Sequence, residues 1–452
     1  MSHTPASPSP SPGSSVSPPS PPSPSPQSSP SPASREVARA AAAVAGPVPE
    51  GAPAAVAGPV PAGPPASPFR QPRAVWAVAF ACVISFMGIG LVDPILPAIA
   101  GDLDASPSQV TLLFTSYLVM TAVAMLITGW VSSRLGAKRT LILGLALIVV
   151  FAALAGTSDS VGGVIGFRAG WGLGNALFIA TSLAVIVGSA SGGFAGAIVL
   201  YESALGVGIA TGPLLGGVLG DISWRGPFLG VSVLMLIALV ATAVLLPPAP
   251  RSERPERLRE PLLALRHRAL AATSVTGLLY NWGFFTMLGY APFLMDLEAM
   301  ELGWVFFGWG LLVAVFAVFG APLLRRALGT PRTLYGNLVL MGADLAVIGF
   351  FHDRPAVVAG AVIVSGVFIG VSNTLVTTAV MSVAPVPRPV ASATYGFVRF
   401  IGGGLAPFAA GKLAEHSGAR LPFLLGAVAV AAGAVVLSTV HRTLSEADTG
   451  HG

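Results

Sequence analysis

Charged residues are scarce in this sequence of 452 residues. Lys, Arg, Asp and Glu together make up 10% of it, whereas an ordinary soluble domain carries about 25%. Hydrophobic residues account for 54%, and so few charges cannot cover so much apolar surface in water. The composition therefore excludes a single soluble globule and indicates a chain whose main solvent is lipid.

Cysteine and histidine are equally sparse. The single cysteine, Cys82, excludes an intramolecular disulfide and a metal site built from cysteines. The six His are scattered without ligand spacing, and we find no nucleophile and base pair and no Gly-rich phosphate loop. We therefore expect neither an enzyme nor a metal or organic cofactor.

The first seventy residues lack the side chains that build a core. Residues 1–34 are almost entirely Ser and Pro, and residues 35–70 are rich in Ala, Pro, Gly and Val. Such a composition predicts a disordered cytoplasmic tail, and it lacks the basic start and apolar core of a signal peptide. The tail is either passive or a docking or phosphorylation segment.

Long apolar runs fill the rest of the chain, each of them long enough to cross a hydrocarbon layer of ~30 Å. We count twelve, at roughly 75–99, 110–131, 140–157, 161–187, 194–219, 227–246, 270–295, 303–324, 333–351, 355–382, 391–411 and 421–440. All are predicted helices, because lipid leaves an open strand edge unsatisfied. The predicted fold class is an all-α membrane protein of two pseudo-symmetric six-helix bundles.

Basic residues predict the orientation of these spans. With the N-terminus in the cytoplasm, sixteen of the 24 Lys and Arg lie on the inner side and four on the outer side. This places both termini in the cytoplasm and attributes the high pI to topology, not to nucleic acid. Lys occurs only at 138 and 412, and this excess of Arg, with the Ala, Gly and Pro content, indicates a high-GC bacterial genome and therefore a bacterial cell membrane. The predicted parts are the tail 1–70, a first bundle 71–246, a cytoplasmic linker 247–269, a second bundle 270–441 and a tail 442–452.

The two sets of six spans resemble each other in sequence. Asn175 in span 4 and Asn373 in span 10 stand 198 residues apart, as do Pro94 in span 1 and Pro292 in span 7. Several such pairs in the same order indicate a duplicated unit, which is typical of transporters that rock about a central cavity.

Several motifs carry a family resemblance. GLVDPILP (90–97), GWVSSRLGAKRT (129–140), FRAGWGLGNA (167–176) and GVGIATGPLLGG (206–217) are similar to motifs of the major facilitator superfamily, and specifically of its twelve-helix drug:proton antiporters. Ser133 stands where that family usually has Asp. The resemblance covers residues 75–441 and implies a twelve-helix multidrug efflux transporter driven by the proton gradient.

The motifs assign gating roles through this resemblance. The candidate gating residues are Gly129, Arg134, Gly136, Lys138, Arg139, Gly208, Gly212, Pro213, Gly216 and Gly217. Glycines four residues apart also line one helix face and allow a neighbouring helix to approach closely, while Pro213 permits a bend. Plain helix packing is the alternative interpretation of any one such pattern.

Charges inside the spans are candidates for proton coupling, because a charge at bilayer depth costs a few kcal/mol and usually faces a cavity or a partner. We select Glu202, Asp93 and Arg168, with Glu202 as the first choice of proton site. Each keeps a structural alternative, an ion pair or a packing contact, and for Asp344 in span 9 the structural interpretation is preferred.

A substrate site for a lipophilic compound needs apolar walls with a few polar groups. The candidate cavity residues are Asn175, Tyr280, Asn281, Phe285, Asn373 and Arg399. Ordinary packing remains the alternative for each of the aromatic residues singly.

The function predicted is proton-coupled export of lipophilic small molecules or drugs by alternating access. The expected partners are the substrate, protons and the lipid bilayer, with no nucleic acid and with the chain a monomer. Two alternatives stay open: a facilitator or exporter of a small polar metabolite such as a sugar, and a membrane sensor or scaffold that does not transport.

Overall fold

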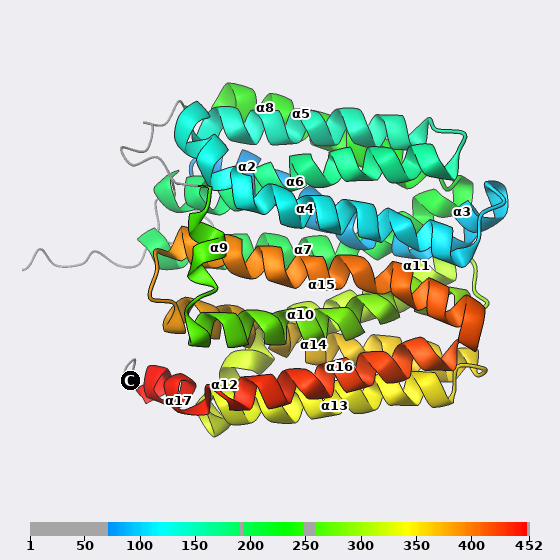
Figure 1. Cartoon of the computed structure of the whole chain (residues 1–452). Helices are drawn as coiled ribbons and strands as arrows, with labels where there is room; N and C mark the ends of the chain where they lie inside the picture. The colour runs from blue at the N-terminus through cyan, green and yellow to red at the C-terminus, as the bar shows by residue number, and fades with distance from the viewer. Residues whose placement is uncertain (1–70, 190–192, 248–257, 450–452) are drawn as a thin grey trace, which may run out of the picture. The chain divides into compact units, whose positions relative to one another are not determined.

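The structure is a computed structural model that describes residues 71–189, 193–247 and 258–449. The predicted tail 1–70 and the middle of the predicted linker lie outside these residues. Within them every regular element is a helix (Figure 1). The predicted fold class is confirmed, with helices at all twelve predicted spans. The boundaries of the five predicted parts remain predictions.

The first six spans correspond to seven α-helices and one turn of 3₁₀-helix. They are α2 (Arg73–Gly90), η1 (Asp93–Ile95), α3 (Leu96–Asp102), α4 (Pro107–Leu135), α5 (Ala137–Gly156), α6 (Val161–Ser189), α7 (Gly193–Ile222) and α8 (Gly226–Leu245). Span 1 is thus interrupted after Gly90, where an unbroken helix was predicted. Because Pro94 lacks an N–H, it cannot continue a regular helix and begins a new turn instead.

The second six spans are interrupted in a similar way. They comprise α10 (Arg268–Tyr290), η2 (Ala291–Leu294), α11 (Ala299–Val315), η3 (Phe316–Gly320), α12 (Ala321–Leu328), α13 (Thr330–Phe350), α14 (Pro355–Val383), α15 (Arg388–Ser417) and α16 (Arg420–Ser438). η3 is a π-helical turn inside predicted span 8. Two short helices add to the prediction, α9 (Glu260–Ala264) in the linker and α17 (His441–Thr449) after the last span.

Local sequence explains where the helices begin and end. Ser106 and Gln109 form a capping box at the start of α4, and Pro107 occupies its first turn. The same helix ends at Gly136, whose φ of 85° favours glycine. α13 and α16 likewise follow glycines of positive φ, Gly329 and Gly418.

The two halves meet along two pairs of helices. α4 lies beside α15, and α7 lies beside α11 (Figure 1). Glycines allow the close approach: a Cβ on Gly404 would lie 3.0 Å from the backbone nitrogen of Val119, and one on Gly217 would lie 2.8 Å from the carbonyl oxygen of Ala299. The two halves also touch at the ends of the helices that lie opposite the start of α2, which we name the outer ends, because η1 contacts α11 and α3 contacts η2.

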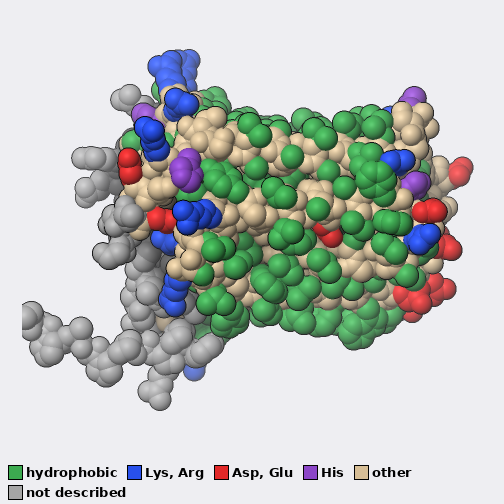
Figure 2. Space-filling view, turned by 90° about the horizontal axis from the view of Figure 1, so that it is seen from below, with side chains coloured by type: hydrophobic (Ala, Val, Ile, Leu, Met, Phe, Trp, Pro, Cys, Tyr) green, Lys and Arg blue, Asp and Glu red, His purple; other side chains and the backbone are tan. Residues whose placement is uncertain are grey.

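The surface between the two ends of the helices is apolar. Large hydrophobic side chains there are exposed, among them Val244 at 76%, Phe319 at 71% and Val435 at 68%. Figure 2 shows a broad hydrophobic band on one face, with most Lys and Arg at one end and most Asp and Glu at the other. Such a band fits lipid contact rather than water.

Candidate transport site

Asp93 lies at the interruption of span 1, as the first residue of η1. Its side chain is fully buried, and neither carboxyl oxygen has a hydrogen-bond partner among the described residues. The turn packs against the fifth span, because a Cβ on Gly90 would meet the ring of Pro213 at 3.1 Å and Asp93 Oδ2 at 3.5 Å. The break in the helix therefore places a carboxyl inside the first bundle.

Arg168 is the second buried charge and belongs to α6. Its guanidinium carbon lies 4.5 Å from the centroid of the Tyr117 ring and 4.6 Å from that of the Trp171 ring. All three side-chain nitrogens are buried without a hydrogen-bond partner in the described part of the chain. The two rings therefore hold the cation by cation–π attraction. Sequence reasoning selected Arg168 but missed both rings; Trp171, one turn away on the same helix, was the available signal.

Each half joins its first helix to its fourth through an asparagine. Ser85 on α2 donates to Oδ1 of Asn175 on α6. In the second half the hydroxyl of Tyr280 on α10 donates to Oδ1 of Asn373 on α14 over 2.9 Å. The equivalence of the two asparagines was predicted from the repeat. In each half the asparagine Oδ1 accepts a hydrogen bond from a hydroxyl on the first helix.

The second-half cluster continues beyond this hydrogen bond. The hydroxyls of Tyr280 and Tyr395 lie 3.2 Å apart. Arg399 follows one turn later on α15, with its guanidinium carbon 5.8 Å from the centroid of the Tyr395 ring and 5.2 Å from that of the Phe400 ring. Three predicted cavity residues, Tyr280, Asn373 and Arg399, thus belong to one cluster. Tyr395 was missed as a site residue, although it heads the repeated segment in span 11.

Two other predicted cavity residues lie outside that chain of hydrogen bonds. The amide nitrogen of Asn281 donates to the carbonyl of Gly277 in its own helix over 2.7 Å, and its Oδ1 has no partner among the described residues. Phe285 packs against Phe284, with ring centroids 4.6 Å apart, and lies where a Cβ on Gly403 would fall. Both side chains are buried, and their roles stay predictions.

Three glycines of the fifth span form a contact face. A Cβ on Gly208, Gly212 or Gly216 would lie 2.2 to 2.5 Å from a backbone carbonyl oxygen of α2 or of the residue that follows it. Such distances are far below van der Waals contact, so α7 approaches the first span as closely as it does only because these residues lack side chains. Gly217 provides the same close approach toward α11, across the boundary between the halves.

Pro213 lies inside α7 between the first and eighth spans. Its ring contacts Gly90, and its carbonyl oxygen lies 3.0 Å from where a Cβ on Gly303 of α11 would be. The second half repeats the contact, because a Cβ on Gly289 would meet Pro407 at 2.7 Å. The proline of the motif thus packs against a glycine of the first helix in each half of the repeat.

The loop after span 2 is built from its own short contacts. Arg134 lies over the ring of Trp130 at 4.2 Å, and Ser133 donates its hydroxyl to the carbonyl of Trp130. Lys138 Nζ donates to the carbonyl of Ala243 at the end of α8 over 2.9 Å. Gly129 lies in the last turns of α4 and Arg139 in the first turn of α5. Their gating roles stay predictions.

Of the two remaining acids within the spans, only Asp344 has a side chain that the structure describes. Glu202 lies in α7, but its side chain is outside the described part of the chain, so the first choice of proton site is untested. Asp344 in α13 is partly exposed, and its Oδ2 has no hydrogen-bond partner among the described residues.

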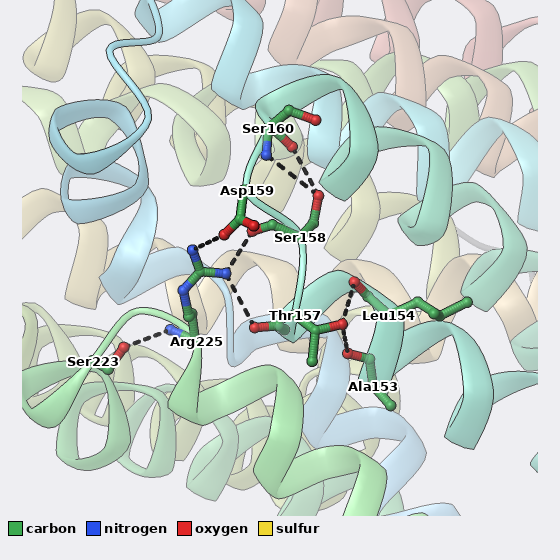
Figure 3. A network of polar contacts seen from close by, with 9 residues as sticks. Ala153, Leu154, Thr157, Ser158, Asp159, Ser160, Ser223 and Arg225 are labelled. Atoms are coloured by element: carbon green, nitrogen blue, oxygen red, sulfur yellow. Dashed lines mark hydrogen bonds and ion pairs between the residues drawn. The ribbon is translucent and has the colours of Figure 1, made fainter.

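The outer loops of the first half are joined by Arg225. Its guanidinium donates to the carbonyls of Gly156 and Ser158 and pairs with Asp159 at 2.9 Å (Figure 3). One side chain thereby joins the turn between α5 and α6 to the turn between α7 and α8. This is a structural contact at the rim of the bundle.

Comparison with known proteins agrees with this geometry. The sequence model of the Major Facilitator Superfamily matches residues 78–407 and 296–451. The chain belongs to this family. The resemblance stated from the motifs is confirmed, and the chain is a multi-pass membrane transporter, as its family is, and not an enzyme.

Similar proteins include bacterial exporters. The chain is 54% identical over 381 residues to the multidrug efflux protein YfmO of Bacillus subtilis, covering 84% of this chain and 96% of that protein. It is 28% identical to the class C tetracycline resistance protein of Escherichia coli, covering 61% and 72%. A crystal structure of a D-xylose-proton symporter has the same fold, with a TM-score of 0.67 at 13% identity, covering 81% of this chain and 96% of that one.

Proposed function

We propose that this protein exports lipophilic small molecules from a bacterial cell in exchange for protons, by alternating access across the cell membrane. The proposal is supported by the similarity to a multidrug efflux protein over nearly its whole length. Proton coupling rests on the buried polar groups of the first half. The chain acts as a monomer with the gradient in place of a cofactor.

The observation that carries the coupling is the pair of Asp93 and Arg168. Both side chains are fully buried, and none of their charged atoms has a hydrogen-bond partner in the described part of the chain. A buried charge without a partner costs several kcal/mol, of the order of 3–5 when a buried pair is broken. Asp93 is therefore most stable when it carries a proton, and a change of position relative to Arg168 changes that preference.

This pair gives a simple exchange cycle. A proton on Asp93 neutralises the carboxyl and leaves Arg168 to its two aromatic rings. Release of the proton restores a negative charge that attracts Arg168 through a low-dielectric interior, where such attraction is strong. Because the two states of Asp93 favour different arrangements of η1 and α6, loading and release of the proton drive the halves between their two conformations.

The orientation follows from the charged ends. Most Lys and Arg lie at one end of the helices (Figure 2), and the sequence places sixteen of 24 on the side that also holds both termini. Basic flanks remain in the cytoplasm during insertion. We therefore propose that both termini are cytoplasmic and that the proton enters from the opposite side.

Proton release from energised everted vesicles tests the proposal. Wild type, Asp93→Asn and Glu202→Gln are compared with a pH-sensitive dye while lipophilic cations and neutral drugs are added. We expect substrate-induced proton release in wild type and its loss in Asp93→Asn, with Glu202→Gln showing whether a second carboxyl is needed. Asp344→Asn is the matched control and should behave as wild type. A wild type that moves no protons with any compound contradicts the coupling.

A further inference from the structure

Arg399 lies on the side of α15 that packs against α10. On α15, Gly396 and Gly404 approach α4, whereas Gly402 approaches α10. Gly403 approaches α10 as well, and at 100° per residue Arg399 lies between Gly402 and Gly403, on the side of α10. Ser392, two turns earlier on the same face, is exposed, and Arg399 itself is half-buried. The face that carries Arg399 therefore borders a space that is accessible from the inner end of α15.

The guanidinium of Arg399 has no counter-charge in the part of the chain that the structure describes. It forms no ion pair with any described carboxylate, and its Nε is buried without a hydrogen-bond partner among the described residues. Its described neighbours are Tyr395, through its ring and a side-chain hydrogen bond, and the ring of Phe400. A cation in such surroundings lacks the compensation that buried charges normally have.

The hydrogen bonds beside Arg399 run in one direction, from Tyr395 through Tyr280 to Asn373. Tyr280 uses its only hydroxyl proton to donate to Oδ1 of Asn373. Tyr395, 3.2 Å away, must therefore donate to Tyr280. The amide nitrogen of Asn373 remains a free donor among the described residues, on a side chain that is half-buried. Arg399 and Asn373 thus offer donors at the two ends of a chain in which the oxygens of Asn373 and Tyr280 already accept.

We propose that Arg399 and Asn373 form a subsite for the anionic group of a substrate. The occupant is an amphiphile with an aromatic or aliphatic body and a carboxylate, sulfonate or phenolate group, and Phe400 beside Arg399 contacts the apolar body. This inference rests on the export activity proposed above and names the class of compound that the second half selects. A guanidinium and an amide donor recognise an anionic oxygen in the geometry that charge-assisted hydrogen bonds require.

A matched pair of fluorescent probes separates charge from shape. 8-Anilinonaphthalene-1-sulfonate is an anion, and N-phenyl-1-naphthylamine is the same ring system without the sulfonate. Export of each probe is measured in proteoliposomes with an imposed proton gradient, for wild type, Arg399→Gln, Arg399→Lys and Asn373→Leu. Each variant is first checked for thermal stability, and binding of both probes to the purified full chain is measured in detergent.

The inference predicts a loss confined to the anion. Because hydrogen bonds to a charged group are stronger than those between neutral groups, Arg399→Gln should weaken binding and export of the sulfonate at least about tenfold. The neutral probe should change less than about twofold, and Arg399→Lys should restore part of the sulfonate transport. Asn373→Leu should show the same selectivity with a smaller loss.

Other outcomes overturn the inference. Equal loss of both probes would make Arg399 a structural or coupling residue, and a wild type that exports the neutral probe but neither binds nor exports the sulfonate would exclude an anion subsite while the export function stands. If neither probe is bound better by wild type than by Arg399→Gln, the subsite is excluded as well. Failure of the export function itself is recognised separately, because then no compound in the proton-release experiment is moved.

Discussion

Among the described residues, Arg168 is held by two aromatic rings instead of by a carboxylate. The rings of Tyr117 and Trp171 come from α4 and α6. Their centroids lie 4.5 and 4.6 Å from the guanidinium carbon. A planar, weakly hydrated guanidinium can face two rings at once, whereas an ammonium is a compact and strongly hydrated point charge. The position therefore requires arginine and not only a positive charge.

Arg168→Lys tests this requirement. We expect it to retain the fold but to lower substrate-induced proton release at least about tenfold, because the ammonium loses contact with one ring and no longer occupies the position of the guanidinium. Arg225→Lys is the matched control: at the outer rim it can keep the ion pair with Asp159, and transport should stay within about twofold of wild type. Normal transport by Arg168→Lys would show that charge alone suffices.

At the scale of the helices, the contact between α7 and the first span depends on the absence of side chains. A Cβ on Gly212 would lie 2.5 Å from the carbonyl oxygen of Met87, a distance that real Cβ atoms do not show. By contrast, nothing lies within 4 Å of a Cβ built on Gly360 in α14. The two glycines therefore differ in their neighbours, and one substitution at each separates packing from helix propensity.

Gly212→Ala should push the two helices apart and lower the free energy of unfolding by about 1–3 kcal/mol, as overpacking of a close contact does. Gly360→Ala should be neutral or more stable by about 0.5–1 kcal/mol, because alanine restricts the backbone without meeting a neighbour. Thermal unfolding of both purified variants, together with their transport activity, measures the difference. Equal stability of the two variants would contradict the close approach.

The sequence predicted the helices better than their interruptions. The length of each apolar run determines a span directly, since lipid imposes its thickness and leaves no alternative to a helix. The π-helical turn of span 8 is different, because Thr374 of α14 donates to the carbonyl of Ala317 within it. Such a contact depends on which helices become neighbours, and no window of sequence contains that information.

The residues of the candidate site could be selected from the sequence, but their neighbours could not. Asp93 and Arg168 could be selected because a charge in an apolar run is visible in the sequence. Their surroundings could not, because Tyr117 reaches Arg168 from another helix. The repeat was the exception: it related Asn175 to Asn373 before either partner was known, since duplicated units keep equivalent contacts.

At the scale of the whole molecule, the two halves are joined at their outer ends. Glu415, near the end of α15, accepts a hydrogen bond from the backbone nitrogen of Ser108 in the first turn of α4 over 3.3 Å, and it pairs with Lys412 at 3.0 Å. A carboxylate at a helix N-terminus is favoured by the unsatisfied N–H groups there. Because Glu415 and Ser108 belong to different halves, this contact can exist only while the outer ends are together.

Glu415 should hold the outer ends closed independently of the external pH over the physiological range. Hydrogen bonds from Ser108, together with those from Lys412 and its positive charge, lower the pKa of Glu415 from 4.5 to about 2. A lowered pKa means that the stabilisation is complete above the ordinary pKa and is lost only as the pH falls toward about 2. Acidification from pH 7.5 to 5 should therefore leave the contact intact, whereas Glu415→Ala removes it at every pH.

Spin labels at positions 102 and 416, in a Cys82→Ser background, measure the separation of the outer ends in the full chain by double electron–electron resonance. These two exposed positions belong to different halves. With Glu415 in place we expect one distance distribution from pH 7.5 to 5, and in Glu415→Ala a larger population of long distances, with Glu446→Ala on α17 as the control at the inner end. A transition with its midpoint between pH 5 and 7 that vanishes in Glu415→Ala would instead make this carboxylate a proton sensor of the outer surface.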